Sequence, residues 1–180
     1  SVEELLKKLE KENRDVIREM KKLLDELEEE NRRVIEEWRR ITKELEDRNR
    51  RVREEIPESD ELRKLVEELK KHLEDDKRRA EKAARDLKDH LRRLEETIRK
   101  MEEELKRHLD KLRRDIERGT DEEIIRRLVK HNKELVDEIR KTIERLREHN
   151  RKLVEKVRED VKRSTKHNRD LVKEVRDRAK

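Results

Sequence analysis

Only two places in this 180-residue chain interrupt a helical pattern, because it contains one proline and one glycine, Pro57 and Gly119. Proline cannot continue a helix, and Ser59 can cap the following helix through its hydroxyl. Gly119 suits the left-handed residue that follows a helix end. The chain is therefore expected to form three long helices joined by two short loops.

The predicted helices span residues 2–56, 58–118 and 121–178, with capping boxes at Ser1/Glu4 and Thr120/Glu123. At 1.5 Å per residue each helix is about 80–90 Å long. Loops this short make consecutive helices antiparallel neighbours. The expected fold is all-α, a single domain over residues 1–180, formed by an antiparallel up-down-up three-helix bundle of nearly straight helices.

The apolar residues follow an 18-residue repeat in each helix: Leu5, Leu23 and Ile41; Leu69, Leu87 and Leu105; Leu135, Leu153 and Leu171. Eighteen residues are five turns of an α-helix, so the repeat favours neither supercoil hand. This regular stripe argues against disorder, which a chain with 59% charged residues and 1% aromatic residues would otherwise suggest.

Polar residues of two kinds follow the same repeat, and they include all six histidines of the chain. The set consists of Asn13, Asn31, Asn49, His72, His90, His108, His131, His149, His167, Asn132, Asn150 and Asn168. Their positions on the helical wheel lie in or beside the apolar stripe, so we expect them in the core or at its boundary. Buried polar groups need hydrogen-bond partners, and asparagine and neutral histidine can supply them to each other.

Folding the chain up, down, up places these residues at three levels. The levels are Asn13 with His108, His131 and Asn132; Asn31 with His90, His149 and Asn150; and Asn49 with His72, His167 and Asn168. Hydroxyls that could complete them are Thr42, Thr142, Ser164 and Thr165. Trp38 replaces Met20 in the repeat and reads as a core filler, whereas Asp76 and the alanines at 80, 83 and 84 depart from the Leu-rich pattern of the second helix.

With its 18-residue repeat, helix caps, scarce glycine and proline, and His/Asn levels, the whole chain resembles de novo designed straight helical bundles with repeated hydrogen-bond networks. More narrowly, it resembles the pH-responsive designs that place histidines in such networks. The resemblance implies a self-assembling structural scaffold, a homo-oligomer or filament, whose assembly is lost in acid.

Three interpretations of the His/Asn levels compete. Histidine changes charge near pH 6.5, which favours a pH switch. Buried polar residues also specify register, so the chain could be a static scaffold or a module that presents a helix face to a partner. A metal site is less favoured, because His-Asn is not a chelating spacing. Catalysis lacks any nucleophile motif or phosphate loop, so we expect neither an enzyme nor a cofactor.

The expected partner is the chain itself. The third helix carries valines outside its central stripe, Val129, Val136, Val154 and Val172, which suggests a surface too apolar to remain exposed. The 56 basic and 51 acidic residues are interleaved, and no aromatic platform is present, so neither nucleic acid nor a small-molecule substrate is expected. No apolar run is long enough to cross a membrane. We expect a soluble chain, cytoplasmic if expressed in bacteria.

Overall fold

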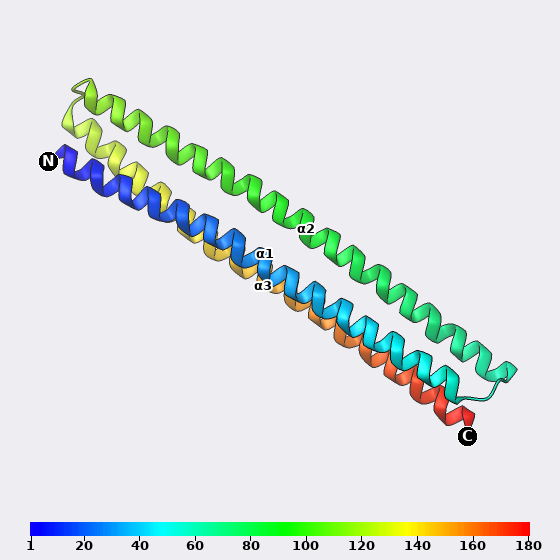
Figure 1. Ribbon diagram of the computed structural model, residues 1–180. Coiled ribbons are helices and arrows are strands. Elements are labelled where there is room, and N and C mark those ends of the chain that lie inside the picture. Colours follow the sequence, from blue (N-terminus) through cyan, green and yellow to red (C-terminus); the bar gives the residue numbers. More distant parts are fainter. The chain divides into compact units, whose positions relative to one another are not determined.

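The computed structural model describes residues 1–180, which form three α-helices: α1 (Val2–Glu55), α2 (Asp60–Glu117) and α3 (Glu122–Ala179) (Figure 1). The all-α three-helix prediction is confirmed. The observed helix ends differ from the predicted ones by one or two residues. Helix ends commonly differ this much from sequence estimates, because the terminal turns are held by caps rather than by packing.

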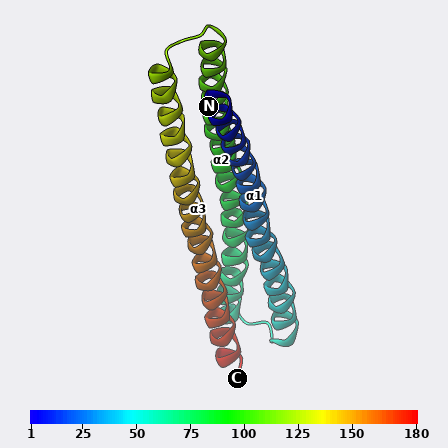
Figure 2. The same ribbon diagram turned by 90° about the vertical axis from the view of Figure 1, so that its left-hand side faces the viewer.

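The first loop joins α1 to α2 (Figures 1 and 2), and α2 begins with the cap that the sequence predicts. Ser59 Oγ accepts a hydrogen bond from the Leu62 amide at 3.2 Å. At the start of α1, Ser1 Oγ accepts one from the Glu4 amide at 3.3 Å. Each hydroxyl satisfies one of the amides that the first turn of a helix leaves without a partner.

The second loop, between α2 and α3, contains the expected left-handed glycine, with Gly119 at a φ of 70°. The Gly119 amide donates to Ile116 O at 3.1 Å and the Thr120 amide to Asp115 O at 3.0 Å, which is the Schellman pattern. The predicted cap of α3 is wrong by one residue, because Asp121 Oδ1, not the Thr120 hydroxyl, accepts from the Glu123 amide at 3.0 Å. Asp121 directly precedes the first residue of α3, Glu122, and therefore occupies the N-cap position.

Contacts within the chain divide it into two compact units, and each helix contributes a segment to both. Unit 1 consists of Ser1–Glu28 and His90–Arg151, and unit 2 of Glu29–Asp89 and Lys152–Lys180. Each unit is described by itself below. The single domain over residues 1–180 remains a prediction.

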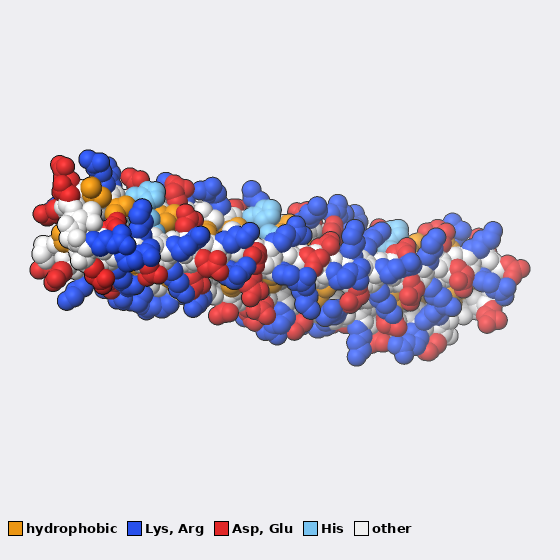
Figure 3. Space-filling view, turned by 90° about the horizontal axis from the view of Figure 1, so that it is seen from above, with side chains coloured by type: hydrophobic (Ala, Val, Ile, Leu, Met, Phe, Trp, Pro, Cys, Tyr) orange, Lys and Arg blue, Asp and Glu red, His pale blue; other side chains and the backbone are white.

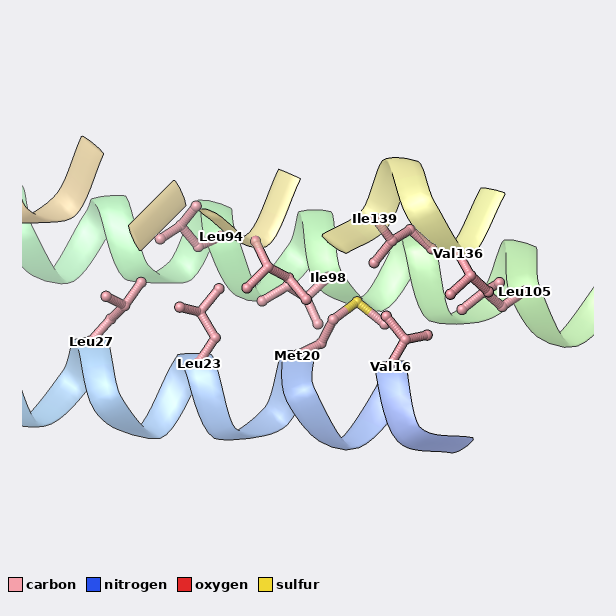
Figure 4. Close-up of a cluster of buried hydrophobic side chains, with 10 residues drawn as sticks. Val16, Met20, Leu23, Leu27, Leu94, Ile98, Leu105, Val136 and Ile139 are labelled. Atoms are coloured by element: carbon pink, nitrogen blue, oxygen red, sulfur yellow. The ribbon is translucent and has the colours of Figure 1, made fainter. Parts of the chain in front are cut away.

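In unit 1, side chains from all three helices meet in a common core. Figure 4 shows Val16, Met20, Leu23 and Leu27 of α1 facing α2 and α3, and these four are at most 1% exposed. Their partners are Leu94, Ile98, Leu105, Val136, Ile139 and Ile143. Nearer the start of the chain, a second cluster contains Leu9, Leu109, Leu112, Ile125 and Val129. In both clusters, the apolar stripes of the three helices face one another and are buried together.

In unit 2, the core contains smaller side chains and one large one. Trp38 packs with Val34, Ile35, Ala80, Leu87, Val154, Val157 and Val161. A further cluster consists of Val52, Leu62, Leu65, Leu69, Leu171, Val172 and Val175. Ala80 belongs to the cluster that contains Trp38, and Ala83 and Ala84 pack against it. Their small side chains leave room for the indole, which accounts for their departure from the Leu-rich pattern.

The expectation of an exposed apolar stripe on α3 is wrong. Val129, Val136, Val154 and Val172 are each no more than 5% exposed within the single chain. They are buried because each α3 segment packs against two helices and therefore needs a wide apolar face. Ile124 is the one large apolar side chain that is exposed.

The outer faces carry Lys, Arg, Asp and Glu side chains (Figure 3), many of them in ion pairs three or four residues apart on one helix. Such exposed pairs contribute little to stability, and the buried clusters supply most of it. None of the three helices has a stretch long and apolar enough to span a membrane.

The corrected cap of α3 can be tested by two neighbouring substitutions. We expect Asp121→Ala to lower the free energy of unfolding by about 0.5–2 kcal/mol, because it leaves a first-turn amide without its acceptor. Thr120→Ala should have little effect, since the Thr120 hydroxyl caps nothing. Guanidinium unfolding followed by circular dichroism measures both, and a larger loss in Thr120→Ala would contradict the assignment.

Candidate functional site

The His108 cluster, in unit 1, consists of Asn13, His108, His131 and Asn132. Asn13 Nδ2 donates to Leu9 O and to Asn132 Oδ1, each at 2.7 Å. Asn132 Nδ2 lies 3.1 Å from His108 Nδ1, and the His108 and His131 rings are 5.0 Å apart between centroids. An amide N–H can donate to Nδ1 only if that nitrogen carries no proton, so this contact selects neutral His108. The predicted residues are brought together here.

The His72 cluster, in unit 2, consists of Asn49, His72, His167 and Asn168, and it is connected differently. Asn49 and Asn168 exchange hydrogen bonds of 2.8 and 2.9 Å between their amides. The rings of His72 and His167 meet edge to face at 4.5 Å between centroids. His72 Nε2 donates to Ser164 O at 3.1 Å, because a carbonyl can only accept. The asparagines and histidines of this cluster therefore form two separate networks, although the sequence predicts one.

The His90 pair, in unit 1, consists of His90 and His149, with ring centroids 5.1 Å apart. His90 Nε2 is buried and makes no hydrogen bond. Asn150 of unit 1 and Asn31 of unit 2 are also buried. Of the three imidazoles on α2, His90 is thus the one whose buried ring nitrogen lacks a partner.

The prediction that all six histidines lie in the core or at its boundary is wrong for α3. His72, His90 and His108 on α2 are half-buried, whereas His131, His149 and His167 are exposed. On α3 each histidine precedes a buried asparagine, and successive helical residues point about 100° apart. The asparagine occupies the apolar stripe and turns its histidine toward solvent. Figure 3 shows histidine side chains at the surface among charged residues.

Burial lowers the pKa of all three α2 histidines, because the imidazolium form loses hydration. The facing histidine of α3 lowers the pKa further in each case. Arg93 adds to the effect at His90 and Lys111 at His108, where the charge of Glu104 acts in the opposite direction and raises the pKa. At His72 the hydrogen bond to the Ser164 carbonyl and the charge of Asp76 act in the opposite direction and raise the pKa, while Arg79 lowers it. The three sites share a chemistry but differ in their surroundings.

A buried aspartate organises a further network in unit 2, which we call the Asp76 network (Trp38, Thr42, Asp76 and Ser164). Asp76 is 1% exposed and accepts hydrogen bonds from one residue of α3 and two of α1. Trp38 Nε1 lies 3.3 and 3.4 Å from its two oxygens, Thr42 Oγ1 donates at 2.9 Å, and Ser164 Oγ donates to Oδ1. All three partners are donors, so the side chain serves throughout as an acceptor, as a carboxylate does.

The sequence contains a signal for this network that its prediction missed. Asp76 stands where the repeat has Leu94 and Leu112, and Ser164 stands where it has Leu128 and Leu146. Thr42 likewise replaces Leu6 and Leu24. Three apolar core positions change to polar residues within the same level of the bundle. Comparing repeats position by position across helices would have brought them together.

Other predicted roles also change. Trp38 is not only a core filler, because its indole N–H donates to Asp76. Thr42 and Ser164 join the Asp76 network rather than the asparagines. Thr142 and Thr165 donate to carbonyls of their own helix, Glu138 O at 2.9 Å and Val161 O at 2.8 Å, and so complete no level.

His72 opens onto a surface groove between α2 and α3 of unit 2, with a volume of about 740 Å³. The groove is lined by Glu68, Lys71, His72, Asp75, Arg79, Asp160, Arg163, Ser164, His167 and Leu171. Solvent protons therefore have direct access to the His72–His167 pair. No three His, Cys, Asp or Glu side chains are grouped so that they could hold a metal ion.

Comparison with known proteins identifies no relative: no family model matches the chain, and neither a curated protein nor a solved structure matches it. A function for the chain is therefore inferred from the chemistry of these side chains.

The reciprocal amide pair of unit 2 leads to a test of what buried asparagines contribute. We expect Asn168→Leu alone to lower the free energy of unfolding by about 1–3 kcal/mol, because the amide of Asn49 is left buried without a partner. The double variant Asn49→Leu/Asn168→Leu should regain most of this loss, since neither side retains an unsatisfied group. Chemical unfolding of the two variants and the parent provides the comparison. If the double variant is the least stable, the amide pair itself is a net source of stability.

Proposed function

We propose that this protein is a structural helical scaffold whose histidine pairs make it sensitive to acid. The main observation in support is that each half-buried histidine of α2 faces a second histidine of α3, with ring centroids 4.5–5.1 Å apart. Acidification would place two positive charges at that distance in each pair. Repulsion and loss of hydration then act together against the packed helices.

The sign of the pH dependence follows from the lowered pKa values of His72, His90 and His108. An unfolded or opened chain binds protons with the ordinary histidine pKa of about 6.5, above the folded value. The stability of the scaffold is therefore present above about pH 6.5 and is lost as pH falls toward the lower folded pKa values. Protonating His108 Nδ1 also removes the acceptor that Asn132 uses.

A second role, the specification of helix pairing, is favoured by one observation. The Asn49–Asn168 pair joins α1 to α3 through two hydrogen bonds that involve no histidine, so protonation of an imidazole removes neither of them. A buried polar pair of this kind penalises any pairing in which one partner meets an apolar side chain. In this proposal, asparagines specify which helix positions meet, and histidines supply the response to pH.

A designed origin and self-association belong to the same proposal and have different support. The 18-residue repeat supports the first. Self-association is no longer supported by the α3 valines, because they are buried within one chain. Light scattering from about pH 7.5 to about pH 4 tests it directly, since this range brackets the histidine pKa. A concentration-dependent mass that falls to one chain in acid supports an acid-sensitive homo-oligomer, and a constant single-chain mass contradicts it.

The switch itself is tested by two triple variants. We expect His72→Asn/His90→Asn/His108→Asn to remove most of the loss of unfolding free energy between about pH 7.5 and about pH 5, because the groups with lowered pKa are gone. Guanidinium unfolding at both pH values measures that loss.

The matched control is His131→Asn/His149→Asn/His167→Asn, which changes the same number of histidines to the same residue on the exposed side of each pair. It should retain more of the parent's pH dependence, since the half-buried imidazoles remain. If both variants lose stability in acid as the parent does, the histidines are structural members of the network and the switch proposal is wrong.

A further inference from the structure

The three α2 histidines occupy the same position in the repeat, and their surroundings differ most at the level of Asp76. Ser164 Oγ donates to Asp76 Oδ1 and lies 3.4 Å from His72 Nε2, so one hydroxyl separates the imidazole from the carboxylate. These two contacts place the imidazole nitrogen within about 6 Å of a carboxylate oxygen. At the corresponding positions, His90 and His108 have Leu94 and Leu112.

Asp76 is a buried negative charge without a cationic partner. Its hydrogen bonds come from three neutral groups, an indole and two hydroxyls. No Lys or Arg forms an ion pair with it, and Lys77, the next residue, pairs instead with Glu46 of α1 and Glu74 of α2. A buried carboxylate held only by neutral donors is stabilised by any positive charge that develops nearby.

The other charges around His72 leave Asp76 as the distinguishing group. In the groove, α2 contributes Glu68, Lys71, Asp75 and Arg79, and α3 contributes Asp160, Arg163 and His167. Apart from the two histidines, these are three acidic and three basic groups in open solvent, where charges are screened. From α1, the side chains that contact Asp76 are Trp38 and Thr42, both neutral.

We propose that Asp76 is the counter-charge of protonated His72, linked to it through the Ser164 hydroxyl, so that the His72 cluster resists acid longer than the His90 pair. This inference rests on the proposed function, and it makes that switch uneven. Protonation of His72 brings a positive charge toward a buried negative one. Protonation of His90 brings a positive charge toward His149 and Arg93, with no carboxylate behind it and a ring nitrogen that has no hydrogen bond.

Acid would therefore disturb unit 1 before unit 2. Unit 1 contains the His90 pair and the His108 cluster, and unit 2 contains the His72 cluster with the Asp76 network. The chain has one tryptophan, and that residue donates directly to Asp76. The indole of Trp38 is thus a built-in probe of the network.

The test is an NMR titration of the imidazole Cε1–H resonances in the full chain, with Trp38 fluorescence recorded on the same samples. In Asp76→Asn, the His72 midpoint should move to lower pH by about half a pH unit, the effect of one charge about 6 Å away in water. The His90 and His108 midpoints should stay unchanged. The matched control is Asp75→Asn, which removes the same charge from the solvent-exposed groove and should move the His72 midpoint less.

A second variant covers the case in which Asp76→Asn fails to fold. Replacing Trp38 by Met, Thr42 by Leu, Asp76 by Leu and Ser164 by Leu gives these positions the residues of the neighbouring repeat, Met20, Leu24, Leu94 and Leu146. In this repeat-restored variant the His72 midpoint should move to lower pH, toward that of His90, although the hydrogen bond to the backbone carbonyl of residue 164 remains.

Two results would overturn the proposal: an unchanged His72 midpoint in Asp76→Asn or in the repeat-restored variant, or a parent chain in which the Trp38 signal is lost at a higher pH than the native His90 resonance. Failure of the proposed pH switch is detected by a different experiment. It appears as unchanged acid stability in the triple histidine variants, whether or not Asp76 affects His72.

Discussion

The requirement that a buried polar group find a partner on another helix underlies the arrangement of this molecule. An asparagine within an apolar stripe is unfavourable by about 1–3 kcal/mol unless another side chain satisfies it. Asn13 finds Asn132, and Asn49 finds Asn168, in each case across α1 and α3. The apolar residues alone could pack in several ways, because leucine accepts many neighbours. The amide pairs accept few, so they select one pairing among those the core would allow.

Most of the fold is predictable from the sequence for other reasons. Pro57 and Gly119 define the loops by stereochemistry, and the 18-residue repeat defines the buried faces of the helices. Helix ends and caps were less predictable, since adjacent residues compete for the same amide. Thr120 and Asp121 are both suitable caps by residue type, and the choice between them depends on whether α3 begins at residue 121 or 122.

The site was predictable as a set of residues but not as a set of bonds. Equal spacing brings each His–His pair together, yet it cannot say that Asn168 pairs with Asn49 while His72 turns to Ser164. It also overestimates the burial of the α3 histidines, because a difference of one residue on a helix separates the core from solvent. The role of Asp76 was not predicted, because a single acidic residue in an apolar stripe looks like an isolated exception. Its network becomes recognisable only when Trp38, Thr42 and Ser164 are compared with the residues at the same positions of the neighbouring repeats.

The positions that depart from the 18-residue repeat bear on the proposed function as much as the repeated positions do. If all three levels were identical, their histidines would respond to pH together, and acid would act on the whole chain at once. In the proposed switch, the buried carboxylate of Asp76 separates His72 from His90, because its charge favours the protonated form that burial disfavours. The apolar core gives up three leucine-type positions to accommodate Asp76, Thr42 and Ser164, and the small alanines of α2 leave room for the large side chain of Trp38. A buried charge is costly to maintain, and in the proposed switch that cost is offset when His72 gains a proton and brings a positive charge toward Asp76.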